Sequence, residues 1–458
     1  MNPARCLPGV VALLIPATLP AGGFQISELC ARCQGQRNAG MAANTDSAAA
    51  GYFNPAALAR LEGPGAELSA HYIYGAFKFR DQGSSNAFGR PLPGETRNDG
   101  AVPAWVPNLH AATPLGRRFG IGISVTAPYG LSVEYDDDWV GRYHALKSDL
   151  QTINVNPTMS WNVTDGFSIG AGAVWQQAEA ELTNAVDFGA LARIVLPQTA
   201  PIPIPPELLP DSGDFALDGL TRLDGDDESW GWTAGLLYQG ERTRAGIGYR
   251  SAIDHTLRGA VTTTLPPQLA GLAGTERIVR AGAADITTPE SVTLGLQHDV
   301  HAQWTLLFGA TWTDWSAFES IEVVDPAGEV ISRQPEDWND SWRYSAGFEY
   351  AYDPAVVFRL GVEYDATPVP ADRLTARIPD ENRYWLATGV TWRVSRRLLV
   401  DFAWTHIWTP SYEIDDTELT TGEVFESFTG ANPGIGNTLR GDYAAEADVL
   451  TLGVRYGY

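Results

Sequence analysis

The chain ends in Val449-Leu-Thr-Leu-Gly-Val-Arg-Tyr-Gly-Tyr458, and this stretch decides the fold. From Leu450 onward every second residue is Leu, Val or Tyr, whereas the residues between them are Thr, Gly or Arg. Successive side chains of a strand point to opposite faces, so one face suits lipid and the other suits a polar lumen. This pattern is typical of a transmembrane β-barrel strand. An ordinary half-buried terminal strand is the alternative.

Both ends of the chain support export to a membrane. Residues 1–21 resemble a signal peptide cleaved after Ala21, because Arg5 precedes an apolar run from Leu7 to Leu19. That run is short and rich in proline, and no other segment approaches the ~20 uninterrupted apolar residues of a membrane-spanning helix. The terminal aromatic residue, Tyr458, is similar to the signal that barrel-assembly machinery recognises. We therefore expect a barrel in the outer membrane of a Gram-negative bacterium.

Composition limits the classes of partner. The chain of 458 residues has 47 Gly, 15 Trp and 17 Tyr, as expected for barrel strands with aromatic girdles. A net charge of −24 makes nucleic acid an improbable partner. Acidic clusters at 136–138 and 224–228 are placed in loops, as a solvated surface or, alternatively, as bridges through divalent cations to lipopolysaccharide. The sequence suggests no cofactor, no metal site and no catalytic residue.

Two cysteines remain after cleavage, in Cys30-Ala-Arg-Cys33. A disulfide is compatible with an oxidising compartment. A thioredoxin-like role would need a βαβ context, which is absent. We expect a local covalent staple.

Alternating segments separated by turn residues number fourteen. The connections between them are alternately short and long, and the longest lie at 183–226, 259–288, 316–340 and 414–443. Short periplasmic turns and long extracellular loops characterise outer-membrane barrels, and an even strand count leaves both chain ends in the periplasm. The expected strands are 66–79, 101–114, 118–128, 150–164, 166–182, 227–240, 244–258, 289–300, 302–315, 341–352, 355–367, 382–395, 397–413 and 444–458.

Residues 22–63, which precede the barrel at 64–458, do not alternate. They form either a disordered periplasmic tail or a plug folded into the lumen. A barrel of fourteen strands is wider than the eight-stranded barrels that side chains alone fill. The fold expected is therefore an all-β, fourteen-stranded antiparallel transmembrane barrel with an N-terminal hatch.

A series of short motifs runs along the chain in a fixed order: Gly23-Phe-Gln25, Ala48-Ala-Ala-Gly-Tyr-Phe-Asn-Pro-Ala56, Ala127-Pro-Tyr-Gly130, Trp139-Val-Gly-Arg-Tyr143, Asn154-Val-Asn-Pro157, Trp312-Thr-Asp-Trp-Ser-Ala-Phe318 and Pro379-Asp-Glu-Asn-Arg-Tyr-Trp-Leu386. Together these motifs resemble the FadL/TodX family of outer-membrane transporters for long-chain fatty acids and other hydrophobic compounds. The match covers nearly the whole mature chain, and the order and spacing of the motifs make it specific.

The resemblance implies a transport mechanism. A long-chain fatty acid or another hydrophobic ligand would be captured by apolar loops, pass to an internal pocket, and leave sideways through a gap beside a kinked third strand. Two loops carry the exposed apolar surface that such capture needs; packing of these loops on each other as a lid is the alternative. The residues expected to capture ligand are Leu191, Ile194, Leu196, Leu208, Leu209, Leu269 and Leu272.

Candidate residues for binding and gating follow from parity and from the motifs. Strand parity points Arg250, Arg343 and Arg383 into the lumen, where they would hold a carboxylate by charge-assisted hydrogen bonds; a salt-bridged wall is the alternative. Pro128 cannot donate to a β-ladder. It marks either a kink or the strand's exit into a loop; the residues favour the exit, and the resemblance favours a functional gap near Pro128 and Tyr129.

In the expected hatch, Asn54 precedes Pro55 and Ala56, and a residue before proline is biased toward an extended conformation. This elbow would gate the pocket or merely launch the first strand.

Three rival functions remain. An outer-membrane enzyme would need a nucleophile with a positioned base, and the seven histidines form no recognisable constellation with Ser and Asp. A general polar-solute porin has little use for a hatch and apolar loops. A structural or adhesive barrel is disfavoured by the family resemblance. We expect a monomeric transporter surrounded by outer-membrane lipid and lipopolysaccharide.

Overall fold

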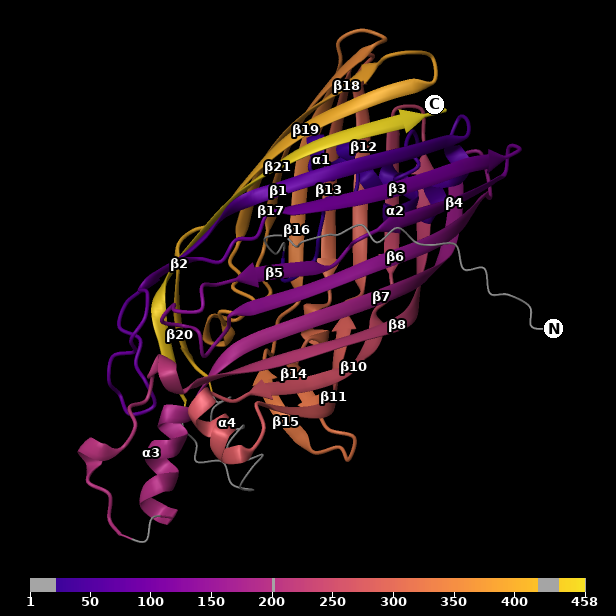
Figure 1. The fold of residues 1–458 in the computed structure, drawn as a ribbon. Helices are drawn as coiled ribbons and strands as arrows, with labels where there is room; N and C mark the ends of the chain where they lie inside the picture. Colours follow the sequence, from indigo (N-terminus) through magenta and orange to yellow (C-terminus); the bar gives the residue numbers. More distant parts are fainter. Residues whose placement is uncertain (1–21, 200–201, 419–435, 458) are drawn as a thin grey trace, which may run out of the picture.

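The computed structural model describes residues 22–199, 202–418 and 436–457, and these form one closed antiparallel β-barrel (Figure 1). The barrel closes where β1 (Gly65–Asp81) pairs with β21 (Thr438–Tyr456). The register runs from Ala66 opposite Tyr456 to Asp81 opposite Gly441. This pairing of the last strand with the first removes the open edge that lipid would not tolerate. The expected signal peptide, residues 1–21, and Tyr458 lie outside the described residues.

Within the described residues the wall has fourteen strands, several of them built from two segments. In wall order they are β1, β3 (Ala104–Leu115), β4 (Phe119–Thr126) with β5 (Gly130–Glu134), β6 (Lys147–Asn162), β7 (Phe167–Asp187), β8 (Asp218–Gln239), β9 (Thr243–Arg250) with β10 (Ile253–Thr264), β11 (Arg277–Thr288) with β12 (Ser291–His301), β13 (Trp304–Thr313), β16 (Ser341–Ala351), β17 (Val356–Asp365), β18 (Arg383–Arg393), β19 (Leu398–Trp408) with β20 (Tyr412–Thr417), and β21.

Smaller elements decorate the wall. No helix in the described part of the chain is long and apolar enough to cross a bilayer. The additional elements are β2 (Arg97–Asp99), α3 (Phe188–Thr199), η3 (Pro206–Leu208), η4 (Phe215–Leu217), α4 (Pro267–Ala273), η5 (Trp315–Ala317), the hairpin of β14 (Ser320–Val324) and β15 (Val330–Pro335), and η6 (Ala371–Arg373).

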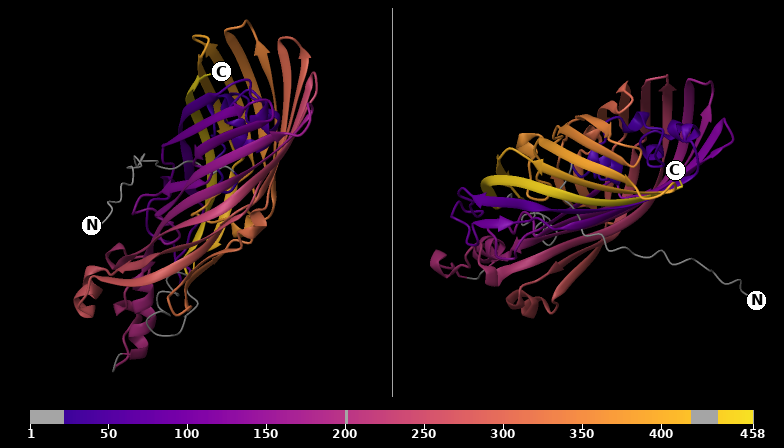
Figure 2. Two further views of the ribbon diagram at one scale, coloured as in Figure 1. Left: turned by 90° about the vertical axis from the view of Figure 1, so that its right-hand side faces the viewer. Right: turned by 90° about the horizontal axis from the view of Figure 1, so that it is seen from above.

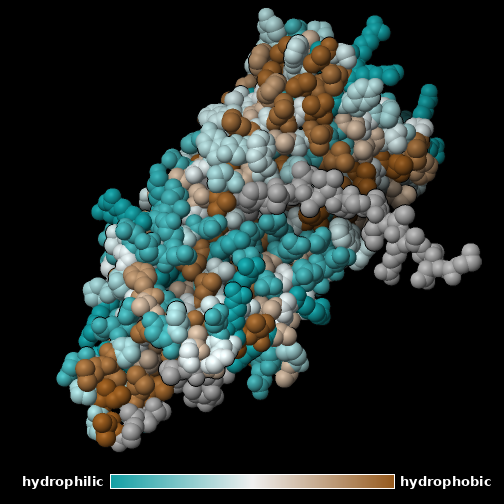
Figure 3. Space-filling view, in the orientation of Figure 1, coloured by the Kyte–Doolittle hydropathy of each residue, from teal (hydrophilic) through white to brown (hydrophobic). Residues whose placement is uncertain are grey.

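The alternation read from the sequence has its expected physical meaning. Leu450 is 47% exposed and Trp230 is 67% exposed on the outer face, whereas Thr451 and Arg455 are buried inside the barrel. Figure 3 shows apolar side chains gathered over the strands near the C-terminal end, and again over α3 at the opposite end. Between these two regions the surface is mostly hydrophilic, so the wall extends beyond an apolar band.

The wall strands are longer than the alternation predicted. Strand β8 begins at Asp218 and β11 occupies 277–288, both inside expected loops. The acidic stretch 224–228 lies on β8 and not in a loop. Hydropathy stops alternating there because the outer face meets water and is as polar as the inner face. The hydrogen-bonded ladder nevertheless continues, which hydropathy cannot show.

The third strand is kinked. Strand β4 pairs with β6 as far as Thr126 opposite Asn154, and β5 resumes on the same partner with Gly130 opposite Gln151. Pro128 therefore lies in a break within one wall strand, and the expectation that it marks the exit into a loop is wrong. Proline has no N–H to give to the ladder, so the break forms where the ladder loses a donor.

Residues 22–60 lie inside the barrel, as Figure 2 shows from above. This segment, here called the hatch, contains α1 (Ala31–Gly35), η1 (Met41–Ala43), α2 (Ala50–Phe53) and η2 (Pro55–Arg60). A disulfide joins Cys30 to Cys33 at the start of α1. Bonds to distant strands hold the hatch in the lumen; for example, Gln34 donates to Thr405 at 2.9 Å.

Glycines on the inner wall make room for the hatch backbone. A Cβ atom placed on Gly246 would lie 1.8 Å from the carbonyl oxygen of Ala42, and one on Gly248 would lie 1.8 Å from that of Phe53. Glycine is the residue that permits such close approach. The lumen is therefore filled by backbone packed on backbone.

Candidate functional site

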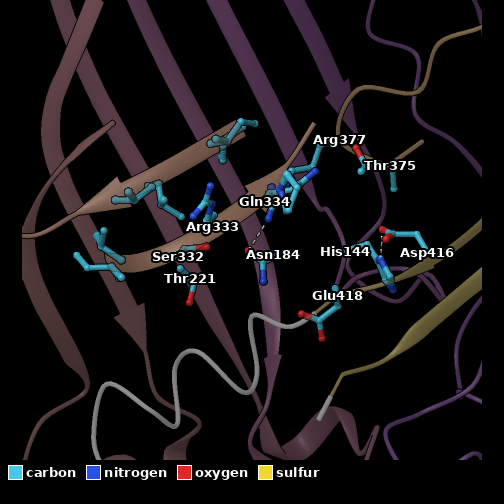
Figure 4. A pocket seen from close by; sticks show the side chains of 18 of the residues that line it. His144, Asn184, Thr221, Ser332, Arg333, Gln334, Thr375, Arg377, Asp416 and Glu418 are labelled. Carbon is cyan, nitrogen blue, oxygen red and sulfur yellow. Dashed lines mark hydrogen bonds and ion pairs between the residues drawn. The ribbon is translucent and has the colours of Figure 1, made fainter. Parts of the chain in front are cut away.

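A large cavity opens at the end of the barrel that carries α3 and α4, and we call it the outer cavity (Figure 4). Its volume is about 320 Å³. The rim is polar: His144 lies 2.9 Å from Asp416, and Arg377 donates to Asn184 at 2.9 Å. Its deeper wall is apolar, with Val261 among the residues there. The outer cavity therefore accepts both polar and apolar parts of a molecule.

A second, almost wholly apolar cavity adjoins the first, and we call it the apolar cavity. Its volume is about 90 Å³. It shares Leu182, Leu223 and Val323 with the outer cavity, so the two cavities adjoin, and we call them together the passage. Its inner limit is set by Phe24 of the hatch and Leu131 of β5. The sequence reasoning did not identify this cavity, because its lining comes from strand segments expected to be loops.

Phe24 closes the bottom of the passage. It is fully buried, with its ring centroid 4.7 Å from that of Trp315 and 5.3 Å from that of Phe318. The rings of Trp338 and Tyr129 complete the enclosure at 5.8 and 6.0 Å. Edge-to-face packing of this kind adds to the free energy of burial. The family-like motifs at 23–25, 127–130 and 312–318 all contribute residues to this enclosure, but no role was predicted for Phe24.

The start of the hatch pairs with the kink in the third strand. Ile26 donates its backbone N–H to Pro128 at 2.8 Å, and Gly130 donates to Phe24 at 2.9 Å. Gln25 and Tyr129 thus face each other as partners in a short antiparallel bridge. A small cavity of about 50 Å³, the kink cavity, lies beside this bridge and is lined by Ile26 and by the outward-facing Ile153.

Arg250 reaches another small cavity, of about 50 Å³, on the other side of Ile26. Its guanidinium carbon stacks 4.2 Å from the ring centroid of Tyr52. One guanidinium nitrogen lies 3.4 Å from both the Tyr52 carbonyl and Asn156 Oδ1, and the other, Nη1, is buried without a hydrogen-bond partner. We call this space the Arg250 cavity.

The other two candidate arginines, unlike Arg250, have carboxylate partners. Arg343 lies 3.6 Å from Glu363 and 3.4 Å from Asp365, and Arg383 forms an ion pair with Asp380. Removing one partner of a buried ion pair costs several kcal/mol of folding free energy. Arg343 and Arg383 therefore serve to hold the barrel wall together. For Arg343 and Arg383 the structure supports the alternative of a salt-bridged wall that supports the hatch.

The Asn54-Pro55 elbow is a structural corner of the hatch. Asn54 Nδ2 donates to the carbonyl of Ala42 at 2.7 Å and to that of Leu236 at 2.9 Å. Its Oδ1 accepts from the N–H of Ala56 at 3.0 Å and so caps η2. Asn54 therefore ties the hatch to β8, and Tyr52, two residues earlier, contacts Arg250.

The apolar loop residues divide into two groups. Leu191 is buried and packs with Phe188 and Leu265 of the two loops, and Leu269 lies against the same cluster. Leu208 is 72% exposed and Leu196 is also exposed. The two loops thus pack on each other and still present apolar side chains to solvent. Ile194 and Leu209 are half-buried, and the side chain of Leu272 lies outside the described residues.

A buried carboxyl group lies close to the Phe24 enclosure, in the connection between β15 and β16. Glu336 accepts from the indole N–H of Trp338 at 2.9 Å and from Gln334 at 3.0 Å. Burial, assisted by repulsion from Asp416, raises the pKa of Glu336 to about 8. Burial at this position therefore favours the neutral form of the Glu336 carboxyl group.

The closed barrel, the hatch inside it and the passage that ends at Phe24 define an outer-membrane transport protein. The family model described as "Outer membrane protein transport protein (OMPP1/FadL/TodX)" matches residues 12–458. The chain belongs to this family, which confirms the resemblance, the outer-membrane location and the expectation of a transporter rather than an enzyme.

Individual relatives agree with this assignment. The chain is 28% identical over 431 residues to the "Long-chain fatty acid transport protein" of Escherichia coli O6:H1, covering 91% of this chain and 94% of the relative. Among solved structures, a Pseudomonas aeruginosa FadL homologue superposes with a TM-score of 0.83 at 23% identity, covering 95% of this chain and 99% of the other. The Ralstonia pickettii toluene transporter TbuX superposes with a TM-score of 0.63 at 17% identity, covering 95% and 99%.

Proposed function

We propose that this protein takes up long-chain fatty acids or other hydrophobic small molecules across the outer membrane and releases them sideways into the bilayer. The observation that carries the proposal is the apolar cavity, which leads from the outer cavity to Phe24 and stops there. A passage for sugars or ions would need a polar lining. An apolar dead end instead holds hydrocarbon away from water.

The proposed route begins at the loops. Exposed side chains such as Leu208 and Leu196 collect the molecule, and the outer cavity receives it. From the apolar cavity onward, only the start of the hatch blocks the way to the kink. Movement of residues 24–26 would join the apolar cavity to the kink cavity, whose lining includes Ile153 on the outer surface. Release there delivers the molecule into lipid.

The surroundings of the barrel follow from the same proposal. A fully closed wall has no free strand edge to pair with a second copy, and in this proposal the protein acts as a monomer. Its outer face contacts outer-membrane lipid and lipopolysaccharide, and barrel-assembly machinery inserts it. These partners are proposals that rest on the barrel architecture and on the family.

Binding by the purified protein tests the proposed function. Oleate and a neutral aromatic hydrocarbon are each titrated into the detergent-solubilised protein, and uptake is measured in a Gram-negative host that lacks its own fatty-acid transporter. We expect saturable binding and restored uptake. Absence of binding, together with a steady polar-solute conductance in planar bilayers, would identify a porin instead.

A cross-link between the hatch and the kink tests lateral release. The double substitution Gln25→Cys and Tyr129→Cys places two thiols on directly opposed residues of the short bridge, where Cα atoms of a non-hydrogen-bonded pair lie about 4.5 Å apart. We expect uptake to fall by roughly tenfold under oxidising conditions and to recover with reductant, since a ~1.4 kcal/mol barrier suffices for that change. The wild type with reductant controls for loss of the Cys30–Cys33 disulfide. Full uptake by the cross-linked protein would contradict release at the kink.

A further inference from the structure

The buried arginines of the lumen differ in one respect, which is whether an acidic partner is present. Arg32 lies 2.8 Å from Glu349, and Arg455 lies 2.7 Å from Asp401. Arg37, Arg343, Arg359 and Arg383 are paired in the same way. Arg250 is 6% exposed and has no carboxylate partner anywhere in the described part of the chain.

An unpaired buried charge is costly, so the surroundings of Arg250 need an explanation. Stacking on Tyr52 offsets part of the cost. The two acceptors of Nη2 lie at 3.4 Å, which is long for a charge-assisted hydrogen bond. Nη1 has no partner at all. The guanidinium group therefore retains an unused capacity to bind an anion.

The Arg250 cavity has the charge and size for a small monoanionic group. Its charged lining consists of Arg250, Arg343 and Glu363, a net charge of +1. The hydroxyl groups of Ser291 and Thr293 lie on the same wall and can donate hydrogen bonds. A volume of about 50 Å³ admits roughly three to five water-sized groups, the size of a carboxylate.

The position of the cavity connects it to the proposed route. Ile26 lines both the Arg250 cavity and the kink cavity, and Phe24, two residues earlier, closes the apolar cavity. Displacement of residues 24–26 would therefore join the apolar cavity, the kink cavity and the Arg250 cavity into one space. A carboxylate that enters this space without a counter-charge would be desolvated at high cost.

We propose that Arg250 is a carboxylate-binding residue at the inner end of the passage, so that the protein is adapted to alkyl carboxylates and not only to neutral hydrocarbons. The proposal rests on the proposed function and assigns the substrate class to it. The planar guanidinium fork binds the head group, with Ser291 and Thr293 as further donors, while the alkyl chain lies toward the kink.

The test compares a charged and a neutral substrate in the same cells. Uptake of oleate and of hexadecane is measured for the wild type, Arg250→Gln and the control Arg244→Gln. Arg244 also lies on β9 and also faces the hatch, where it pairs with Asp299 at 3.7 Å, but it does not line the Arg250 cavity. We expect the ratio of oleate to hexadecane uptake to fall by about tenfold in Arg250→Gln and to change by less than about twofold in the control, given the strength of hydrogen bonds to charged groups.

The outcomes separate the two proposals. A wild type that takes up neither compound overturns the proposed function. If the wild type takes up both compounds and the ratio is unchanged in Arg250→Gln, the role proposed for Arg250 is overturned and the proposed function stands. Folding of each variant is checked by heat-modifiable migration on gels. If Arg250→Gln does not fold, Arg250→Lys is tested instead, because lysine keeps the charge but lacks the planar guanidinium group. The ratio of oleate to hexadecane uptake should then fall by about threefold. An unchanged ratio would overturn the proposal.

Discussion

Replacing Gly246 with Leu is expected to displace the hatch and to open the lumen to ions and polar solutes. A Cβ atom at this position would lie 1.8 Å from the carbonyl oxygen of Ala42, inside the van der Waals contact distance. Ala42 is fully buried, and a Cβ atom on Gly295 of the neighbouring strand would lie 2.9 Å from the backbone nitrogen of the same residue. The clash is with backbone, so no side-chain rotation can relieve it. The barrel wall has its own hydrogen-bonded ladder and should remain closed.

The magnitude follows from the cost of overpacking. Insertion of methylene groups into a packed interior costs roughly 1–3 kcal/mol or more, and each ~1.4 kcal/mol raises the undocked population about tenfold. The matched control is Ala245→Leu, one residue earlier on β9, where the side chain faces outward. Conductance in planar bilayers and sensitivity of cells to a large polar antibiotic are the measurements. Wild-type conductance in Gly246→Leu would show that the hatch does not seal the lumen.

Replacing Ala284 with Trp is expected to abolish uptake of hydrophobic molecules while the barrel and hatch remain intact. Ala284 lies on β11 opposite Leu257 and Val323, which are buried, and it lines the apolar cavity. That cavity holds about 90 Å³, which an indole ring would largely occupy. The substituted ring is apolar and meets apolar walls, so the fold should tolerate it.

The control for this block is Ala281→Trp, on the same strand but on the exposed face. We expect uptake of oleate and of hexadecane to fall by about tenfold or more in Ala284→Trp, because a lost binding step of ~1.4 kcal/mol already gives that factor. Both compounds should be affected equally, which distinguishes this block from the charge-selective effect at Arg250. Unchanged uptake would mean that molecules do not pass through the apolar cavity.

The sequence predicted the wall of the barrel correctly because the physical cause is local. Successive side chains of a strand face lipid and lumen in turn. The apolar Leu450 and the polar Thr451 therefore show by residue type alone which face each of them occupies. The same logic failed at Asp224, which lies on a strand above the apolar band. There water contacts the outer face, so residues on both faces are polar and hydropathy does not alternate, although the hydrogen-bonded ladder continues.

The candidate site was predicted only in part. The alternation along the strands placed Arg250, Arg343 and Arg383 in the lumen, but it predicted the same carboxylate-binding role for all three. Which of them is paired depends on carboxylates that other strands bring close, such as Glu363 and Asp365 for Arg343. Phe24 was not assigned a role, because its enclosure is built from Trp315, Phe318 and other rings far along the chain.

The sequence by itself thus determined that this chain is a closed barrel of fourteen strands with a non-alternating segment before it. Alternation and turn residues act over a few positions, and a barrel is the way that alternating strands satisfy every backbone group in lipid. The tertiary structure alone decided where the passage ends, that the third strand resumes after Pro128, and that Arg250 has no acidic partner among the residues that the structure describes. These features arise from contacts between residues that lie from about twenty to several hundred positions apart, which no local pattern records.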